Sequence, residues 1–189
     1  MPTSMTVEQL QPRLGELAVI DVRSPGEYAA GHIPGAFNIP LDELDSAVPA
    51  LRTVAGRREL AFVCASGNRS QTACNQVSNA GIAAFTLVGG TTAWARSGHR
   101  LDREPGGRSV WAMDRQVRLT AGSLVMLGLL ADLALPGARW LSAAVGGGLV
   151  FSAVSNTCAM GQMLGKLPFN RPISTAARSL EDTLAALQQ

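Results

Sequence analysis

The chain has 189 residues, of which 16% are charged and 47% are hydrophobic, with a formal net charge of +2. Ordinary soluble domains carry roughly 25% charged residues. A disordered chain, an acidic tail or a basic nucleic-acid-binding protein needs more charge than this, so we expect no nucleic acid partner. Three cysteines are too few for a disulfide scaffold of this size.

The first hundred residues alternate between short apolar runs and helix-like stretches. β-Branched runs bounded by turn residues predict strands, and an N-cap such as Ser24 followed by Pro25 predicts a helix start. We expect strands at 17–22, 36–39, 60–63 and 84–88, and helices starting at Thr6 and Ser24 and spanning 41–51, 70–80 and 91–95. Strands separated by helices predict an α/β fold, with a parallel sheet and helices on both faces.

Residues suited to chemistry gather after the predicted strand at 60–63. Cys64 follows that strand directly, and sites in parallel α/β sheets form at the carboxyl ends of strands. A loop that turns backbone N–H groups toward one point stabilises a thiolate, which is the reactive form of cysteine. Arg69 either presents its donors to an anionic substrate or holds the loop. We therefore predict a nucleophilic Cys64 and a substrate-binding loop of Ala65, Ser66, Gly67, Asn68, Arg69 and Ser70.

Several other polar residues have structural roles in this interpretation. Asp21 and Arg23 end a neighbouring strand, and we expect them to form an ion pair that supports the loop. His32 and Trp94 are expected to be structural, and Cys74 is expected to pack inside the helix that follows the loop.

The segment Leu119–Gly165 contains only two charged residues, Asp132 and Arg139. Two apolar runs, 117–135 and 141–164, flank a Pro-Gly turn and would span roughly 28 and 36 Å as helices, enough to cross a bilayer. Small residues of the second run, among them Gly146, Gly147 and Gly148, are typical of close helix approach in lipid. The pattern predicts a transmembrane helical hairpin in contact with membrane lipid, which we expect to form a homodimer.

The basic residues predict the orientation of this hairpin. Arg115 precedes the first run, Arg118 lies near its start, and Lys166 and Arg171 follow the second run, which places both ends in the cytoplasm under the positive-inside rule. The first ten residues show no signal-peptide pattern. We therefore expect an N-terminal domain at 1–104, a linker at 105–116, the hairpin at 117–164 and a cytoplasmic tail at 165–189, in which the leucines at 180, 184 and 187 form one face of a short surface helix.

The loop resembles the Cys-x-x-Gly-x-Arg-Ser active-site loop of rhodanese-type sulfurtransferases. The stretch 19–23, the His-Ile-Pro-Gly-Ala stretch at 32–36, and Val88-Gly89-Gly90 with Trp94 match further motifs of that family, in order over about residues 5–100. The resemblance implies that the Cys64 thiolate takes sulfur from thiosulfate or a persulfide donor. The resulting cysteine persulfide then passes its sulfur to cyanide or a thiol. The implied mechanism needs no metal and no organic cofactor.

The hairpin resembles the small membrane domain that is fused to single rhodanese domains in bacterial inner-membrane proteins. Residues 115–117 and 167–171 carry that resemblance, with Phe169 standing where a tryptophan is usual. Cys158 near the inner end of the second run is a candidate secondary thiol that relays sulfur or electrons.

Three alternatives to sulfur transfer stay open at this stage. The first is a cysteine phosphatase, although the loop of such an enzyme has five residues between its cysteine and its arginine and this chain has four between Cys64 and Arg69. The chain could instead be a redox or nitrosative sensor that is modified at Cys64. It could also export thiocyanate or another sulfur anion as an oligomer.

Overall fold

The computed structural model describes residues 3–104, 111, 113–155, 160, 163–164, 167 and 180–187. The chain divides into two compact units, one formed by Met1–Val110 with Arg171–Gln189 and the other by Trp111–Asn170. Each unit is described by itself below.

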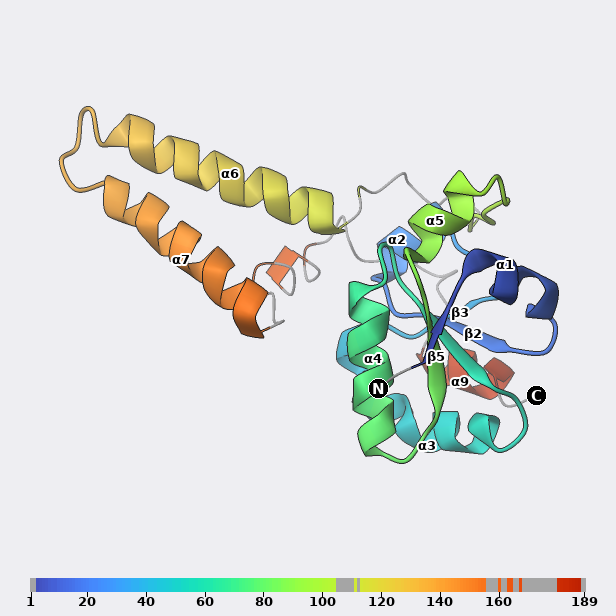
Figure 1. Ribbon diagram of the computed structural model, residues 1–189. Coiled ribbons are helices and arrows are strands. Elements are labelled where there is room, and N and C mark those ends of the chain that lie inside the picture. Colours follow the sequence, from blue (N-terminus) through green and yellow to red (C-terminus); the bar gives the residue numbers. More distant parts are fainter. Residues whose placement is uncertain are drawn as a thin grey trace. The chain divides into compact units, whose positions relative to one another are not determined.

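The first unit is built on a five-stranded parallel sheet with the strand order β1-β5-β4-β2-β3 (Figure 1). The strands are β1 (Thr3–Met5), β2 (Ala18–Asp21), β3 (Phe37–Asn38), β4 (Leu60–Val63) and β5 (Ala84–Leu87). The predicted strands are confirmed, with β4 matching its predicted bounds. Sequence analysis missed β1, because two of its three residues are exposed polar side chains that give no apolar run.

Helices cover both faces of this sheet, as predicted. The helices and 3₁₀ turns are α1 (Val7–Leu10), η1 (Gln11–Arg13), α2 (Pro25–Ala30), η2 (Leu41–Glu43), α3 (Leu44–Ala55), α4 (Asn68–Asn79), α5 (Gly90–Arg96) and α9 (Leu180–Leu187). Residues of α3, α4 and α9 pack in one hydrophobic cluster against the sheet, and residues of α1, α2 and α5 pack in a second.

Alternation along the central strands assigns side chains to these two clusters. Ile20 and Phe62 are fully buried in the cluster that contains α3 and α4, whereas Val19 and Val63 belong to the other. This is the two-residue period of a strand that is buried on both faces. Cys64 continues the alternation and falls in the first cluster, so the residue after β4 is held by the core.

Helix α9 completes the first cluster. Leu187 is buried there, and Leu180 and Leu184 pack against the same group. The helix expected at the leucines 180, 184 and 187 is therefore present, with its apolar face against α3 and β3.

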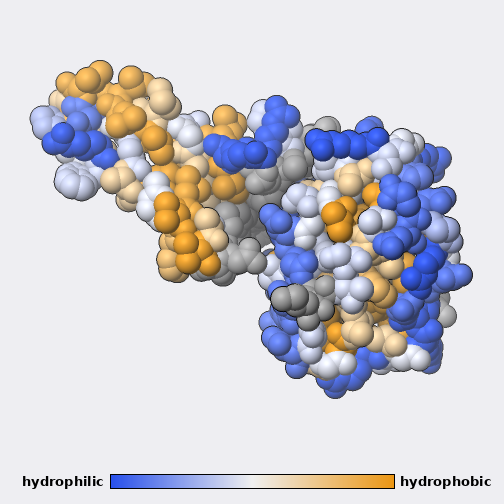
Figure 2. All heavy atoms as spheres, in the orientation of Figure 1, coloured by the Kyte–Doolittle hydropathy of each residue, from blue (hydrophilic) through white to orange (hydrophobic). Residues whose placement is uncertain are grey.

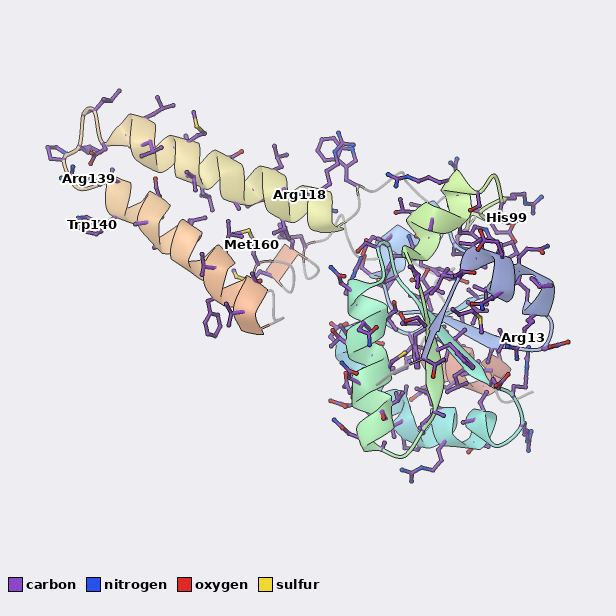
Figure 3. The ribbon with its side chains drawn as sticks, viewed as in Figure 1. Arg13, His99, Arg118, Arg139, Trp140 and Met160 are labelled. Carbon is purple, nitrogen blue, oxygen red and sulfur yellow. The ribbon has the colours of Figure 1, made fainter. Side chains whose placement is uncertain are left out.

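The second unit is a helical hairpin of α6 (Met113–Ala131) and α7 (Arg139–Ser155). The predicted apolar run 117–135 is helical only to Ala131, because Asp132 accepts hydrogen bonds from the backbone N–H groups of Gly137 at 2.8 Å and Arg139 at 3.2 Å. Asp132 therefore fixes the turn between the helices. Arg139 and Trp140 lie at the start of α7 beside this turn (Figure 3).

The two helices approach each other closely at Gly128. A Cβ at this position would lie 2.3 Å from Ser142 Oγ, and that hydroxyl donates a hydrogen bond to Val125 O at 2.9 Å. A Cβ at Gly146, Gly147 or Gly148 would meet nothing within 4 Å, so these glycines are not the contact between α6 and α7.

Large hydrophobic side chains lie at the surface of the hairpin (Figure 2). Leu133 is 86% exposed and Val154 is 85% exposed. Within the described residues, no helix combines the length and the apolar character needed to cross a bilayer. The predicted run 141–164 extends past the end of α7 at Ser155 into positions that lie partly outside the described residues.

We expect Leu187→Ala to lower the free energy of unfolding by roughly 2 kcal/mol, because it empties a buried position in the cluster beneath α9. Thermal unfolding of the detergent-solubilised full chain measures this loss. Glu181→Gln, at an exposed position of the same helix, is the matched control. Equal stability of the two variants would contradict the packing of α9.

Candidate active site

Cys64 is the first residue after β4 and lies at the carboxyl edge of the sheet. Its side chain is 1% exposed, and Sγ accepts a hydrogen bond from the backbone N–H of Gly67 at 3.1 Å. The Ser70 hydroxyl lies 3.7 Å from the same sulfur. One backbone N–H and one hydroxyl thus lie beside the sulfur of the predicted nucleophile.

The Ser70 hydroxyl joins the cysteine to the neighbouring strand. Its oxygen lies 2.7 Å from Thr86 Oγ1 on β5 and 2.9 Å from Gly67 O. Because a hydroxyl has a single proton, Ser70 donates to one acceptor at a time. Ser70 and Thr86 are both buried, so the Ser70 hydroxyl is held in position by partners within the protein.

Gly67 forms the turn between the cysteine and α4. Its φ of 108° lies in the left-handed region that favours glycine, and α4 starts at the next residue, Asn68. The N-terminus of a helix carries partial positive charge. The loop that begins at Cys64 therefore ends on a helix terminus that favours an anion.

The start of α5 holds the other side of the loop. The backbone N–H of Thr91 donates to Cys64 O at 2.8 Å, and that of Thr92 donates to Ala65 O at 3.1 Å. Gly90 has a φ of 57°, and a Cβ there would lie 2.1 Å from Cys64 O. Only glycine lets α5 approach the Cys64 loop this closely.

Arg69 makes a bidentate ion pair with Glu27 of α2. Nη1 donates to Oε2 at 2.7 Å and Nη2 donates to Oε1 at 2.8 Å. Burial by itself lowers the pKa of Arg69, but the hydrogen bonds and charge of Glu27 outweigh it, so the pKa is raised. Two roles were predicted for Arg69, binding an anionic substrate and holding the loop, and this contact corresponds to the second.

Asp21 and Arg23 form a second buried ion pair. Arg23 Nη2 donates to Asp21 Oδ2 at 2.6 Å and to Gly31 O at 2.7 Å. Burial lowers the pKa of Arg23 and the charge of Asp21 raises it, with a net rise. Asn38 Nδ2 bonds the backbone carbonyls of both residues at 2.9 Å. The expected ion pair is present. Arg23 also bonds Gly31, the residue after α2, and Asn38 of β3 bonds the backbone of the pair.

His32 stacks on Tyr28, and Trp94 Nε1 donates to Arg100 O at 2.9 Å, so each has a structural partner. Cys74 is buried in the core, where burial raises the pKa of its thiol to about 12. Cys158 lies outside the described residues, so its role as a secondary thiol stays a prediction. The loop positions Ser66 and Asn68 are exposed.

Sequence analysis gave Glu27 and Thr86 no part in the site and quoted Gly90 only within a family motif. Glu27 appears in the sequence only as part of a capping pattern with Ser24, and Ser24 Oγ does contact Glu27 Oε2 at 3.1 Å. Thr86 looks like an ordinary strand residue. Gly90 follows β5 in a Gly-Gly pair, and that pair was the available signal of a close backbone approach.

Two protein families match the chain, and the boundary between the matches lies near the boundary between the two structural units. Residues 6–97 match the rhodanese-like domain family, and residues 110–178 match the transmembrane domain of YgaP-like inner membrane proteins. An uncharacterized protein of Synechocystis sp. is 37% identical over 168 residues, which is 88% of this chain and 90% of that protein.

Two solved structures share the fold of the first unit. A rhodanese-related protein from Thermoplasma volcanium is 30% identical with a TM-score of 0.50, over 54% of this chain and 99% of that chain. The BH2092 protein from Bacillus halodurans is 18% identical with the same TM-score, over 60% of this chain and 88% of that chain, and shares the fold alone. The chain belongs to the rhodanese family and carries a C-terminal domain of the YgaP-like inner-membrane type. This second domain supports a location in a bacterial inner membrane.

We expect Gly90→Ala to disrupt the loop that follows Cys64, because a Cβ cannot lie 2.1 Å from Cys64 O. Gly98→Ala is the matched control, since Gly98 also has a positive φ but nothing within 4 Å of a Cβ. Both variants carry the left-handed backbone cost of roughly 1–2 kcal/mol, and Gly90→Ala adds the clash. Thermal unfolding and Cys64 alkylation rates measure the difference, and equal behaviour would contradict the close approach.

Proposed function

We propose that this chain is a sulfurtransferase anchored in the inner membrane, which moves sulfane sulfur through a persulfide on Cys64. The observation that carries the proposal is the cysteine sulfur at the end of β4, bonded by the Gly67 N–H at 3.1 Å and followed by the N-terminus of α4. Such a loop supplies donors for one sulfur anion bound to Cys64. Membership of the rhodanese family supports this class of reaction.

The proposed reaction has two covalent steps. The Cys64 thiolate attacks the outer sulfur of a donor, and the donor's S–S bond breaks, with the electron pair leaving on the remainder of the donor. A second nucleophile, cyanide or a thiol, then attacks the outer sulfur of the Cys64 persulfide and restores the thiolate. No oxidant or reductant is consumed.

The arrangement of Arg69 favours this reaction over phosphate chemistry. A cysteine phosphatase needs its loop arginine to bind phosphate oxygens, whereas both Nη atoms of Arg69 contact Glu27. The shorter spacing between Cys64 and Arg69 points the same way. The sensor and exporter alternatives are tested by the experiment below, because neither requires Cys64 to gain and pass on sulfur.

We expect Cys64 to gain the mass of one sulfur atom when the full chain is incubated with a sulfane donor, and to lose it on addition of cyanide. Peptide mass spectrometry measures both steps. Cys74→Ser is the matched control and should behave as the natural chain does, because burial keeps the Cys74 thiol neutral with a pKa of about 12. Cys64→Ser should take up no sulfur. Sulfur uptake by Cys64→Ser, or none by the natural chain, would overturn the proposal.

We also propose that both ends of the hairpin face the cytoplasm. Helix α9 packs in the core of the first unit, so the chain returns to that unit after residues 111–170. This return supports an even number of membrane crossings. The arginines at 115 and 118, in the first two turns of α6, set the cytoplasmic side.

Reporter fusions test this orientation in living bacteria. A green fluorescent protein joined after residue 189 should fluoresce, because it folds in the cytoplasm. An alkaline phosphatase inserted at Gly137, in the turn of the hairpin, should be active because it reaches the periplasm. The reverse pattern at both sites would contradict the proposed orientation.

A further inference from the structure

Thr86 places a buried hydroxyl beside apolar side chains of the central strands. It pairs with Phe62 of β4 in the parallel register, so its side chain lies on the same face of the sheet as Phe62, which packs with α3 and α4. Thr86 is only 3% exposed. A valine would fill the same volume, and burying a hydroxyl costs free energy unless the hydroxyl is hydrogen-bonded. The hydroxyl of Thr86 therefore needs a partner inside the protein.

That partner is the hydroxyl of Ser70 in the first turn of α4, whose oxygen lies 2.7 Å from Thr86 Oγ1. Within the residues that the structure describes, Ser70 is the one hydrogen-bond partner of the Thr86 hydroxyl. The Ser70 oxygen has two further neighbours, Gly67 O at 2.9 Å and Cys64 Sγ at 3.7 Å. Three groups therefore compete for the single proton of Ser70.

The number of protons sets the direction of the bond between the two hydroxyls. If Ser70 donated to Thr86, the proton of Thr86 would have no acceptor in the part of the chain that the structure describes. If Thr86 donates to Ser70, the proton of Ser70 is free to bond Gly67 O or Cys64 Sγ, and both hydroxyl protons have an acceptor. A buried donor without an acceptor is costly, so Thr86 donates and Ser70 accepts.

Charge on the sulfur decides between the two acceptors of the Ser70 proton. A hydrogen bond to an ionised group is stronger than one to a neutral group, so a thiolate at Cys64 draws the proton away from the carbonyl of Gly67. Gly67 O keeps its hydrogen bond from the Gln71 N–H at 3.0 Å when the Ser70 O–H rotates, so that carbonyl stays bonded. A hydroxyl that itself accepts a hydrogen bond is a stronger donor, so Thr86 strengthens the contact to sulfur.

We infer that Thr86 is a positioning residue for the second step of sulfur transfer, in which it holds the Ser70 hydroxyl ready to stabilise Cys64 Sγ as the leaving group. The inference rests on the proposed transfer through Cys64 and adds a residue to it. Sγ is uncharged in the persulfide and gains negative charge as the S–S bond breaks. The hydrogen bond from Ser70 is therefore stronger in the transition state than in the persulfide, and it lowers the barrier.

The step balances with cyanide as the acceptor. The carbon of cyanide attacks the outer sulfur of the Cys64 persulfide, a C–S bond forms, the S–S bond breaks, and the electron pair passes to Sγ. The persulfide anion and cyanide carry two negative charges together, as do the thiolate and the thiocyanate that result. The Ser70 proton stays on its oxygen throughout.

The test measures the discharge of a preloaded persulfide in a single turnover. The full chain in neutral detergent is loaded with sulfur from thiosulfate, freed of donor and mixed with cyanide, and peptide mass spectrometry follows the loss of one sulfur atom from Cys64. Thr86→Val and Thr86→Ala remove the hydroxyl, whereas Thr86→Ser keeps it. Ser70→Ala is measured alone and together with Thr86→Val. Thr183→Val is the matched control, because it makes the same change at a buried position of α9.

We expect Ser70→Ala to lower the discharge rate constant by about fivefold, the effect of one hydrogen bond of ordinary net strength, and Thr86→Val to lower it by about threefold. Thr86→Ala should match Thr86→Val, and Thr86→Ser should keep the natural rate constant. Thr86→Val should have no effect in a chain that already carries Ser70→Ala, because Thr86 acts through that hydroxyl. Thr183→Val should discharge at the natural rate.

Each outcome separates the inference from the function on which it rests. A natural discharge rate constant in Thr86→Val and Thr86→Ala, or an equal effect of Thr86→Val with and without Ser70→Ala, overturns the role of Thr86 and leaves sulfur transfer standing. Slowing by Thr183→Val as large as that by Thr86→Val does the same. Absence of sulfur on Cys64 of the natural chain overturns sulfur transfer itself, and the role of Thr86 with it.

Discussion

The ion pair between Glu27 and Arg69 joins helices that lie against opposite faces of the sheet. Helix α2 belongs to the side of α1 and α5, whereas α4 packs with α3 and α9. The pair spans the carboxyl edge of the sheet, where the cysteine loop lies. Removing one partner of a mostly buried pair leaves an uncompensated charge, which costs roughly 3 kcal/mol. The ion pair therefore links the shape of the loop to the packing of helices on both faces of the sheet.

The same pair explains which parts of the site could be predicted from sequence. Cys64 and its loop were found because a strand, a cysteine, a glycine and a helix start are adjacent in the chain. Glu27 lies 42 positions from Arg69 and was visible only as a helix cap. Its ion pair with Arg69 depends on where the fold places α2 relative to α4. A local sequence pattern contains no information on that distance. The contact of Gly90 was not predicted for the same reason, because it is made with Cys64 O, far away in sequence.

The fold was predicted more fully than the site for a related physical reason. Buried parallel strands are continuous apolar runs, so β2, β4 and β5 can be read directly from the sequence. The edge strand β1 has two exposed residues and needs the partner β5 to become a strand. In the hairpin, hydrophobicity predicted the two helices, but the end of α6 is set by the Asp132 carboxylate. Polar contacts decide boundaries that apolar patterns leave undefined.

Helix α9 has a consequence for the order in which the molecule is made. The ribosome synthesises α9 only after the whole hairpin, yet Leu187 fills a position in the same cluster as Phe62 and Leu51. A domain whose core lacks one of its helices exposes apolar surface, and it is less stable until that helix is made and packs. The maturation of the cysteine domain is thus coupled to the synthesis of the membrane segment. A nascent chain that stalls within residues 111–170 carries Gly67, Ser70 and Thr91 beside Cys64, but not the finished core behind them.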